Sequence, residues 1–148
     1  MNRLVVLIEE GGKERRAHIT NTGRLEEYLE NGRWGFCFPT PETQKTECRL
    51  FVVEEEASGA LIDTQFQMRA FEKAWEAGFL SWLSGFRLVR RNPRIGISRM
   101  DCLFQHARRP VPVEAKSAVL RKDGFALSPD CPTLRGQRHV KDLPVDLS

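Results

Sequence analysis

The hydrophobic pattern of this chain changes its period at Asp63. Before Asp63, short apolar runs alternate with turn signals such as the Gly11-Gly12 pair, a pattern typical of strands joined by tight turns. Strands are predicted at residues 3–8, 14–19, 36–38, 49–53 and 59–62, with a short helix at residues 25–29. Short strands at this spacing indicate a small β-barrel. A domain boundary is expected where they end, between residues 1–60 and residues 61–148.

Beyond this boundary, large apolar residues recur at helical spacing. They are Phe66, Ala70, Phe71, Ala74 and Trp75, with Asp63 or Thr64 able to cap the helix and Gly78 able to end it. A second helical piece is predicted at residues 79–83, strands at 86–89, 95–104 and 111–120, a turn at 122–124 and a last helix at 135–143. We interpret the aromatic residues of the first two helical segments as core, not as a surface for stacking bases.

Composition and charge narrow the class of protein. The chain has 41% hydrophobic and 29% charged residues and lacks a long apolar run, so a cytoplasmic protein without a membrane partner is expected. Its four cysteines do not form a Cys-x-x-Cys pair, and they are expected to be thiols, not zinc ligands. Residues 1–60 carry 8 Lys and Arg against 11 Asp and Glu, and residues 61–148 carry 15 against 9. Any binding of a polyanion is therefore expected mainly in the second half.

Three charged residues stand inside apolar, strand-like runs: Asp101, Glu114 and Lys116. Glu114 and Lys116 are two residues apart, so in a strand they point the same way, and Asp101 can join them if the two strands pair. Two carboxylates suit Mg²⁺ or Mn²⁺, and a lysine beside them could orient an attacking water during phosphodiester hydrolysis. The alternative is a structural salt bridge between Lys116 and Glu114.

Basic residues gather in two further segments. The first holds Arg87, Arg90, Arg91, Arg94 and Arg99, which could contact phosphates or could form a solvated basic face. The second places Arg135, Arg138 and His139 on the predicted last helix, close to its N-terminus, which favours anions; the alternative is a solvated helix face. A loop at residues 20–23 could also bind phosphate, although turning the chain and capping a helix is the commoner role of such a loop.

Taken in order, these motifs resemble the sugar fermentation stimulation protein A family. The matching segments are residues 17–25, 61–64, 98–101, 113–117 and 129–139. The resemblance implies an α+β or α/β chain, in which an N-terminal OB-like barrel precedes a restriction-endonuclease-like domain of the PD-(D/E)xK kind. It implies a DNA-binding protein linked to sugar metabolism, with a nuclease-like role. The catalytic residues would be Asp101, Glu114 and Lys116, the first two holding the metal.

The residues expected to contact nucleic acid combine the arginine cluster with the basic motif that the resemblance identifies. From the cluster the set takes three arginines, without Arg87 and Arg94, so that it comprises Arg90, Arg91, Arg99, Arg135, Gln137, Arg138 and His139.

Two departures from the family pattern leave the function open. The family has a glutamate on the strand before Asp101, whereas residues 88–93 here contain no acid. The family also continues past the Arg135-Gly136-Gln137 motif for several dozen residues, so the second domain is expected to be truncated. The alternatives are therefore a metal-dependent nuclease, a non-catalytic nucleic-acid-binding regulator, and a module that completes its sheet with a partner, for example as a homodimer.

Overall fold

The computed structural model describes residues 4–21, 23, 25, 27–41 and 45–127. These residues fall into two compact units. The first unit runs from residue 4 to Phe71 and includes residues 117–127, and the second unit comprises Glu72–Lys116. The predicted boundary at residue 60 stays a prediction.

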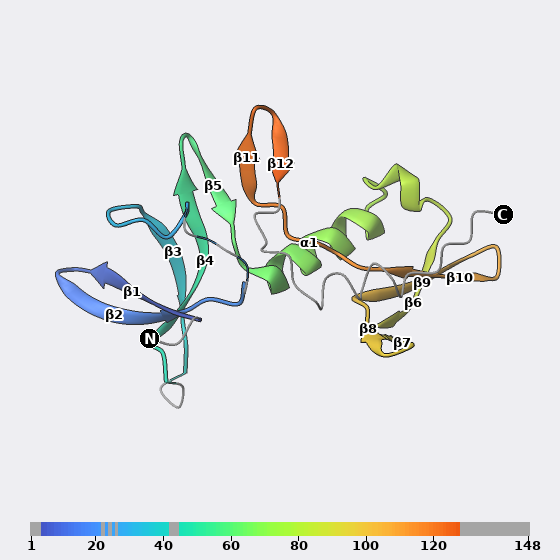
Figure 1. Cartoon of the computed structure of the whole chain (residues 1–148), viewed down its shortest axis with the longest axis horizontal. Coiled ribbons are helices and arrows are strands. Elements are labelled where there is room, and N and C mark those ends of the chain that lie inside the picture. The colour runs from blue at the N-terminus through green and yellow to red at the C-terminus, as the bar shows by residue number, and fades with distance from the viewer. Residues whose placement is uncertain (1–3, 22, 24, 26, 42–44, 128–148) are drawn as a thin grey trace. The chain divides into compact units, whose positions relative to one another are not determined.

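The first unit is built on one five-stranded sheet (Figure 1). Its strands are β1 (Val5–Glu10), β2 (Lys13–His18), β3 (Gly35–Pro39), β4 (Cys48–Glu55) and β5 (Ser58–Leu61). The order is β1-β2-β4-β3, with β5 paired to β4; β2 and β4 run parallel and the other pairs are antiparallel. The predicted Gly11-Gly12 turn is confirmed: both glycines have positive φ, of 59° and 74°, which glycine adopts without strain.

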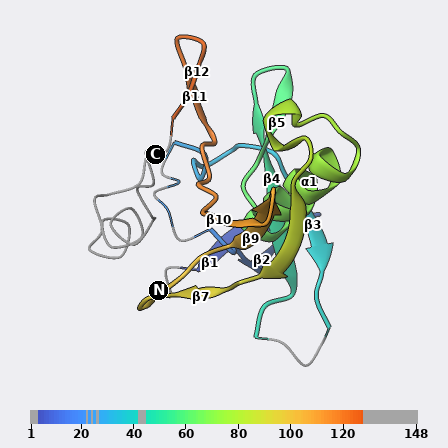
Figure 2. The same cartoon turned by 90° about the vertical axis from the view of Figure 1, so that its right-hand side faces the viewer.

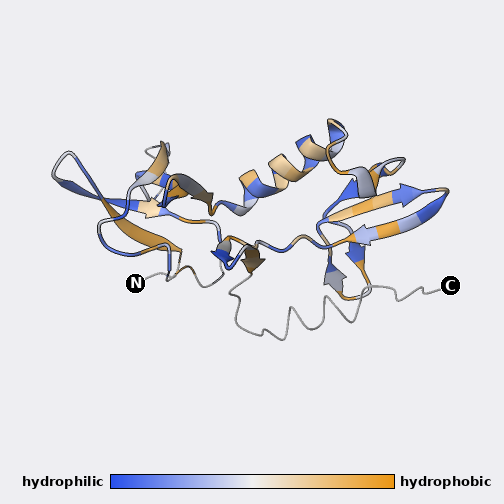
Figure 3. Cartoon of the chain, turned by 90° about the horizontal axis from the view of Figure 1, so that it is seen from above, coloured by the Kyte–Doolittle hydropathy of each residue, from blue (hydrophilic) through white to orange (hydrophobic). Residues whose placement is uncertain are grey.

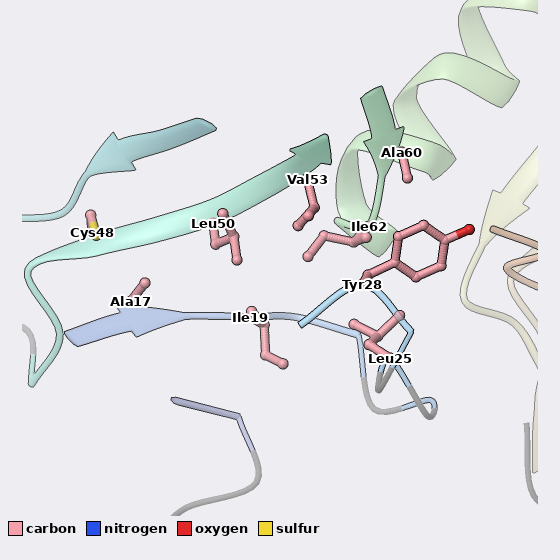
Figure 4. Packing of buried hydrophobic residues seen from close by; sticks show 9 residues of the cluster. All are labelled: Ala17, Ile19, Leu25, Tyr28, Cys48, Leu50, Val53, Ala60 and Ile62. Atoms are coloured by element: carbon pink, nitrogen blue, oxygen red, sulfur yellow. The ribbon is translucent and has the colours of Figure 1, made fainter. Parts of the chain in front are cut away.

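A hydrophobic core lies on one face of this sheet. Its nine buried residues point toward one another in Figure 4: Ala17, Ile19, Leu25, Tyr28, Cys48, Leu50, Val53, Ala60 and Ile62. Tyr28 is 2% exposed, and its hydroxyl donates a hydrogen bond of 2.5 Å to the carbonyl oxygen of Val119. This bond fastens the segment that precedes the last hairpin to the core of the first unit.

Helix α1 (Thr64–Glu76) begins where the sequence predicts it. The Asp63 carboxylate accepts a hydrogen bond of 2.9 Å from the backbone N–H of Phe66, so Asp63 is the N-cap. Gly78, with a φ of 77°, lies just beyond the C-terminal end. Hydrophobic and hydrophilic residues alternate along the helix in Figure 3. A 3-10 turn, η1 (Ser81–Leu83), follows in the second unit.

The second unit carries a three-stranded antiparallel sheet in the order β10-β9-β6. Its strands are β6 (Arg87–Arg91), β9 (Cys102–His106) and β10 (Arg109–Val113), and a small hairpin of β7 (Arg94–Ile95) and β8 (Ser98–Arg99) lies between β6 and β9 in the chain. Phe104 is fully buried and meets the ring of Trp75 edge-on at 5.2 Å.

A last hairpin, of β11 (Leu120–Lys122) and β12 (Phe125–Leu127), belongs to the first unit. Figures 1 and 2 show it as a separate two-stranded ribbon. Asp123 and Gly124 both have positive φ, of 50° and 80°, which confirms the predicted turn.

Four predictions of secondary structure or burial are wrong. The strand predicted at 95–104 is broken into β7, β8 and β9, and the one predicted at 111–120 is interrupted between Val113 and Leu120. The helix predicted at 25–29 is a single turn closed by the bond from the Leu29 N–H to the Leu25 carbonyl oxygen. Phe79 and Trp82, predicted as core, are 82% and 63% exposed. The helix predicted at 135–143 lies outside the described residues.

Within the part of the chain that the structure describes, no helix is long and apolar enough to cross a membrane.

Candidate functional site

The β9–β10 hairpin sets the positions of Asp101 and Glu114. Its register pairs His106 with Arg109 and Cys102 with Val113, across a two-residue turn at Ala107 and Arg108. Both turn residues have positive φ, of 46° and 68°, as a type I′ turn requires. Continuing this register by one residue places Asp101 opposite Glu114. Residues that stand opposite each other in an antiparallel pair project from the same face.

A hydrogen bond joins the two segments at this point. The backbone N–H of Ala115 donates to Oδ2 of Asp101 at 2.8 Å. Asp101 lies between Met100 and Cys102, both fully buried, and its carbonyl oxygen accepts a bond of 2.8 Å from the Asn92 N–H. The structure therefore holds the Asp101 carboxylate beside the Glu114-Ala115-Lys116 segment.

Lys116 and Glu114 form an ion pair. The Lys116 Nζ lies 2.7 Å from Oε1 of Glu114, whose side chain is 10% exposed, whereas the lysine side chain is 51% exposed. The contact agrees with the expectation that residues two apart in an extended segment share a face. It places a cation of the protein against one of the two carboxylates.

The donor set of this site fits a hydrated divalent cation. Asp101 and Glu114 offer hard oxygen atoms, which Mg²⁺ prefers, and Mg²⁺ keeps several of its waters when bound by one or two carboxylates. Among the described residues, no three His, Cys, Asp or Glu side chains gather closely enough to hold a metal.

Cys102 adjoins Asp101 in the chain, but it is a packing residue. Burial raises the pKa of its thiol to about 11, and the side chain is fully buried. A thiol in this state is a poor nucleophile and a poor metal ligand, because both roles require the thiolate.

The five arginines between residues 87 and 99 are all exposed, but two have polar partners within the second unit. Arg91 donates two hydrogen bonds, of 2.8 and 2.7 Å, to the carboxylate of Glu72 on α1, and these bonds hold the pKa of Glu72 below its usual value. Arg87 donates to the side-chain oxygen of Gln105 at 2.6 Å. The Glu72 partner of Arg91 was not foreseen, since the two residues are 19 positions apart.

Arg94 and Arg99 stand directly opposite each other in the β7–β8 hairpin. Like charges at directly opposed positions destabilise a strand pair, and a bound anion would offset that repulsion. Arg99 was predicted to contact nucleic acid. Arg94 was part of the arginine cluster but not of the predicted site, and the register is what associates it with Arg99.

The loop at residues 20–23 has the commoner of its two expected roles. The Thr20 hydroxyl oxygen accepts a hydrogen bond of 3.1 Å from the Thr64 N–H at the start of α1. Asn21 accepts a bond of 2.8 Å from the Gly23 N–H, and its amide donates to Ser117 at 3.4 Å. These bonds turn the chain and cap the helix.

The predicted contacts Arg135, Gln137, Arg138 and His139 lie outside the described residues.

The comparisons with known proteins agree with this architecture. Residues 1–62 match the family model of the SfsA N-terminal OB domain, and residues 65–145 match that of the sugar fermentation stimulation protein RE domain. The order of the two matches confirms the predicted fold class, an OB-type barrel followed by a restriction-endonuclease-like domain.

Proteins similar to this chain share almost its whole length but are longer. The chain is 46% identical over 143 residues to the sugar fermentation stimulation protein homologues of Pyrococcus furiosus and Archaeoglobus fulgidus, covering 97% of this chain and 62% and 61% of theirs. A solved structure of Pyrococcus furiosus SfsA in complex with Ca²⁺ matches with a TM-score of 0.86 at 45% identity, covering 96% of this chain and 61% of that one. The chain thus spans about three fifths of the length of these proteins.

Proposed function

This chain belongs to the sugar fermentation stimulation protein family, and we propose that it is a cytoplasmic DNA-binding protein whose carboxylate site hydrolyses phosphodiester bonds with Mg²⁺ or Mn²⁺. The observation that carries the proposal is the 2.8 Å hydrogen bond between the Ala115 N–H and Asp101. This bond joins the Asp101 segment to the Glu114-Ala115-Lys116 segment across the β9–β10 hairpin, which supports a site that combines two carboxylates and a lysine.

The charges around this site support phosphodiester chemistry. Two like-charge pairs occur close together in the chain. Arg94 is opposite Arg99, and the register of β9 and β10, extended by one residue, puts Asp101 opposite Glu114. The carboxylate pair suits a cation and the arginine pair suits an anion. A phosphodiester accompanied by a divalent cation supplies both, which is why the two pairs together favour this substrate class over a neutral one.

Each residue has a definite task in the proposed reaction. Asp101 and Glu114 would hold the metal, which supplies Lewis-acid stabilisation of the charge that develops on the phosphate. The Ca²⁺ in the Pyrococcus furiosus structure supports a divalent cation, since Ca²⁺ and Mg²⁺ both take oxygen ligands. The side chain of Lys116 is half exposed. Its ion pair with Glu114 would break, and the freed ammonium group would orient the water that attacks the phosphorus. Water adds to phosphorus and the bond to the leaving oxygen breaks, which yields a phosphomonoester and an alcohol.

Exposed arginines would position the nucleic acid. The phosphate contacts would come from three arginines close in the chain to Asp101, which are Arg90, Arg94 and Arg99. Arg91 would also contact phosphate, with its guanidinium held in position by Glu72. The predicted contacts Arg135, Gln137, Arg138 and His139 are retained in this proposal on sequence grounds alone.

A second candidate is a non-catalytic nucleic-acid-binding regulator linked to sugar metabolism. The observation that favours it is the ion pair of Lys116 with Glu114, which neutralises one of the two carboxylates. The described residues also offer no third acidic ligand at this site. In this case DNA binding would depend on salt but not on divalent metal.

The first prediction separates the two candidates. The Asp101→Asn variant keeps an oxygen that can accept the Ala115 N–H but loses the negative charge. Plasmid cleavage with Mg²⁺ or Mn²⁺ is expected in the native protein and should fall at least about a hundredfold in Asp101→Asn, in line with the loss of an electrostatic group at a reacting phosphate.

Asp123→Asn is the matched control, because Asp123 lies in the turn between β11 and β12, within the first unit. Cleavage that survives Asp101→Asn would contradict the assignment. Salt-dependent binding without cleavage, and with no heat of Mn²⁺ binding that requires Glu114, would favour the regulator.

A further inference from the structure

The outer face of the β3–β4 pair carries aromatic side chains. On β4, Cys48 and Leu50 belong to the core, so Arg49 and Phe51 between and beside them project from the opposite face. The register with β3 shifts at Phe51, and beyond this irregularity Val53 is again a core residue. On β3, Cys37 packs against the core, while Phe36 and Phe38 on either side of it are 61% and 43% exposed. A solvent-facing side of an antiparallel sheet is normally polar, so these exposed rings require an explanation.

The rings form one contiguous surface, which we name the aromatic face: Phe36, Phe38, Phe51 and Phe66. Phe38 and Phe51 are stacked, with centroids 4.2 Å apart and planes at 17°. Phe66 of α1 lies 5.4 Å from Phe38 and 5.8 Å from Phe51, and Phe36 lies 6.5 Å from Phe51. Because the inner rings are packed against one another, the exposed rings of Phe36 and Phe38 are held in place before any ligand binds.

Two arginines accompany these rings. The guanidinium carbon of Arg49 is 5.7 Å from the centre of the Phe66 ring, and that of Arg69 is 5.4 Å from it. The acidic partner of Arg49 is Asp63, whose side chain is fully buried, and Arg69 is exposed. Arg69 therefore places an exposed positive charge beside the aromatic face.

We infer that the aromatic face binds single-stranded nucleic acid by stacking its unpaired bases on Phe36 and Phe38, with Arg69 contacting the backbone phosphates. Exposed aromatic rings beside cationic groups are the combination that holds single strands without regard to sequence, and OB-type barrels bind oligonucleotides on a strand face. A duplex cannot use these rings, since its base faces are already stacked on one another. The inference rests on the proposed nucleic-acid binding and adds to it a second surface, in the first unit, that selects the unpaired state.

The test compares a single strand with a duplex on the full chain. The probe is a fluorescent oligothymidylate of about 16 nucleotides, the upper end of the site size of one OB domain. A labelled duplex of the same length is titrated in parallel.

The double variant Phe36→Leu, Phe38→Leu keeps apolar side chains on the sheet but removes both rings. The affinity for the single strand should fall about tenfold or more, because stacking one base on one ring changes affinity about 5- to 150-fold. The affinity for the duplex should not change.

Leu7→Ala is the matched control, since Leu7 is a 47% exposed apolar residue on β1. It should leave both affinities unchanged, and thermal melts should show that each variant is folded.

The outcomes are distinct. Loss of single-strand affinity in the Phe36, Phe38 variant but not in Leu7→Ala supports the inference. Unchanged single-strand affinity in the double variant overturns it while leaving the proposed function standing, whereas a native protein that binds neither probe overturns both. A dimer in light scattering that the same variant dissociates, with oligonucleotide binding intact, would assign the face to a second copy of the chain and overturn the inference.

Discussion

At the scale of single residues, Asp63 is the most consequential charge in the first unit. Its carboxylate is fully buried, and Arg49 donates to its two oxygens at 2.5 and 2.7 Å. Burial by itself raises the pKa of Asp63, but the hydrogen bonds from Arg49, from the Phe66 N–H and from Thr20 outweigh it, so the pKa lies below 3.8. The Asp63 side chain thus caps α1 and neutralises the guanidinium group of Arg49, which lies beside Phe66 of the aromatic face.

Removing the partner of a buried charge is costly, and the second prediction concerns Arg49→Leu. The substitution leaves Asp63 buried and unpaired, so the free energy of unfolding at pH 7 should fall by about 3 kcal/mol. Urea denaturation followed by circular dichroism measures it. Arg15→Leu is the control, because Arg15 pairs with Glu10 at the surface, with side chains 42% and 66% exposed, and should change stability by less than about 1 kcal/mol.

The sign of the pH dependence follows from the lowered pKa of Asp63. As the pH falls, the unfolded chain takes up this proton before the folded chain does, so the stabilisation is complete above about pH 5 and declines below about pH 4. The difference in unfolding free energy between the native protein and Arg49→Leu should therefore narrow from pH 7 to pH 3. A difference that stays constant or widens would show that the ion pair is not its source.

At the scale of elements, two short hairpins determine the candidate site. The β9–β10 turn at Ala107 and Arg108 sets the register that pairs Cys102 with Val113, and just beyond this pair the Ala115 N–H bonds to Asp101. Periodicity could predict that charged residues lie in strand-like runs, but not this register, because Ala-Arg is not a recognisable turn sequence, unlike the Gly11-Gly12 pair that was predicted correctly. The turn between β7 and β8 begins with Gly96, which has a φ of 59°. One glycine inside the strand-like run at residues 95–104 did not predict a break, so the pairing of Arg94 with Arg99 was missed.

The third prediction uses that pairing. Arg94→Glu replaces a repulsive cross-strand pair with an attractive one, so the unfolding free energy should stay level or rise, by at most about 1 kcal/mol. Duplex affinity should nevertheless fall, because the substitution removes one of the two arginines proposed to bind phosphate. Denaturation and duplex titration on the same samples measure the two effects.

Arg108→Glu makes the same change in net charge at another exposed position of the second unit and should weaken binding less. A variant that loses stability and keeps its affinity would show that the arginine pair serves the fold and not a ligand.

At the scale of the whole molecule, sequence reasoning was most accurate where local pattern determines structure. The helix after Asp63, the Gly11-Gly12 turn and the order of the two domains were all predicted correctly, since caps, turn residues and ordered motifs are local signals. The aromatic face was missed because burial depends on what packs against each residue. Phe79 and Trp82 were assigned to the core on spacing alone, and Phe36 and Phe38 raised no signal.

The uneven distribution of charge between the two halves of the chain also determines how the affinity for duplex DNA responds to salt. Residues 61–148 carry the excess of positive charge. Arg90, Arg94 and Arg99 are the exposed cluster arginines for which the described structure gives neither an ion pair nor a side-chain hydrogen bond. If three phosphates are contacted, the logarithm of duplex affinity should fall with the logarithm of salt concentration at a slope of about −2.7, which is roughly a 40-fold loss from 50 to 200 mM salt.

The last prediction is that Arg135→Ala with Arg138→Ala lowers the steepness of this slope by about two, from near −4.5 to near −2.7, if both residues also contact phosphates. Titrations with duplex DNA between 50 and 200 mM salt measure this slope for the native protein and for the variant. Lys122→Ala with Arg121→Ala removes two positive charges from the β11–β12 hairpin and is the matched control, which should leave the slope unchanged. A slope near −2.7 in the native protein, unaffected by Arg135→Ala with Arg138→Ala, would confine phosphate binding to the arginines before Asp101. The basic motif at residues 135–139 would then need a role other than gripping the backbone.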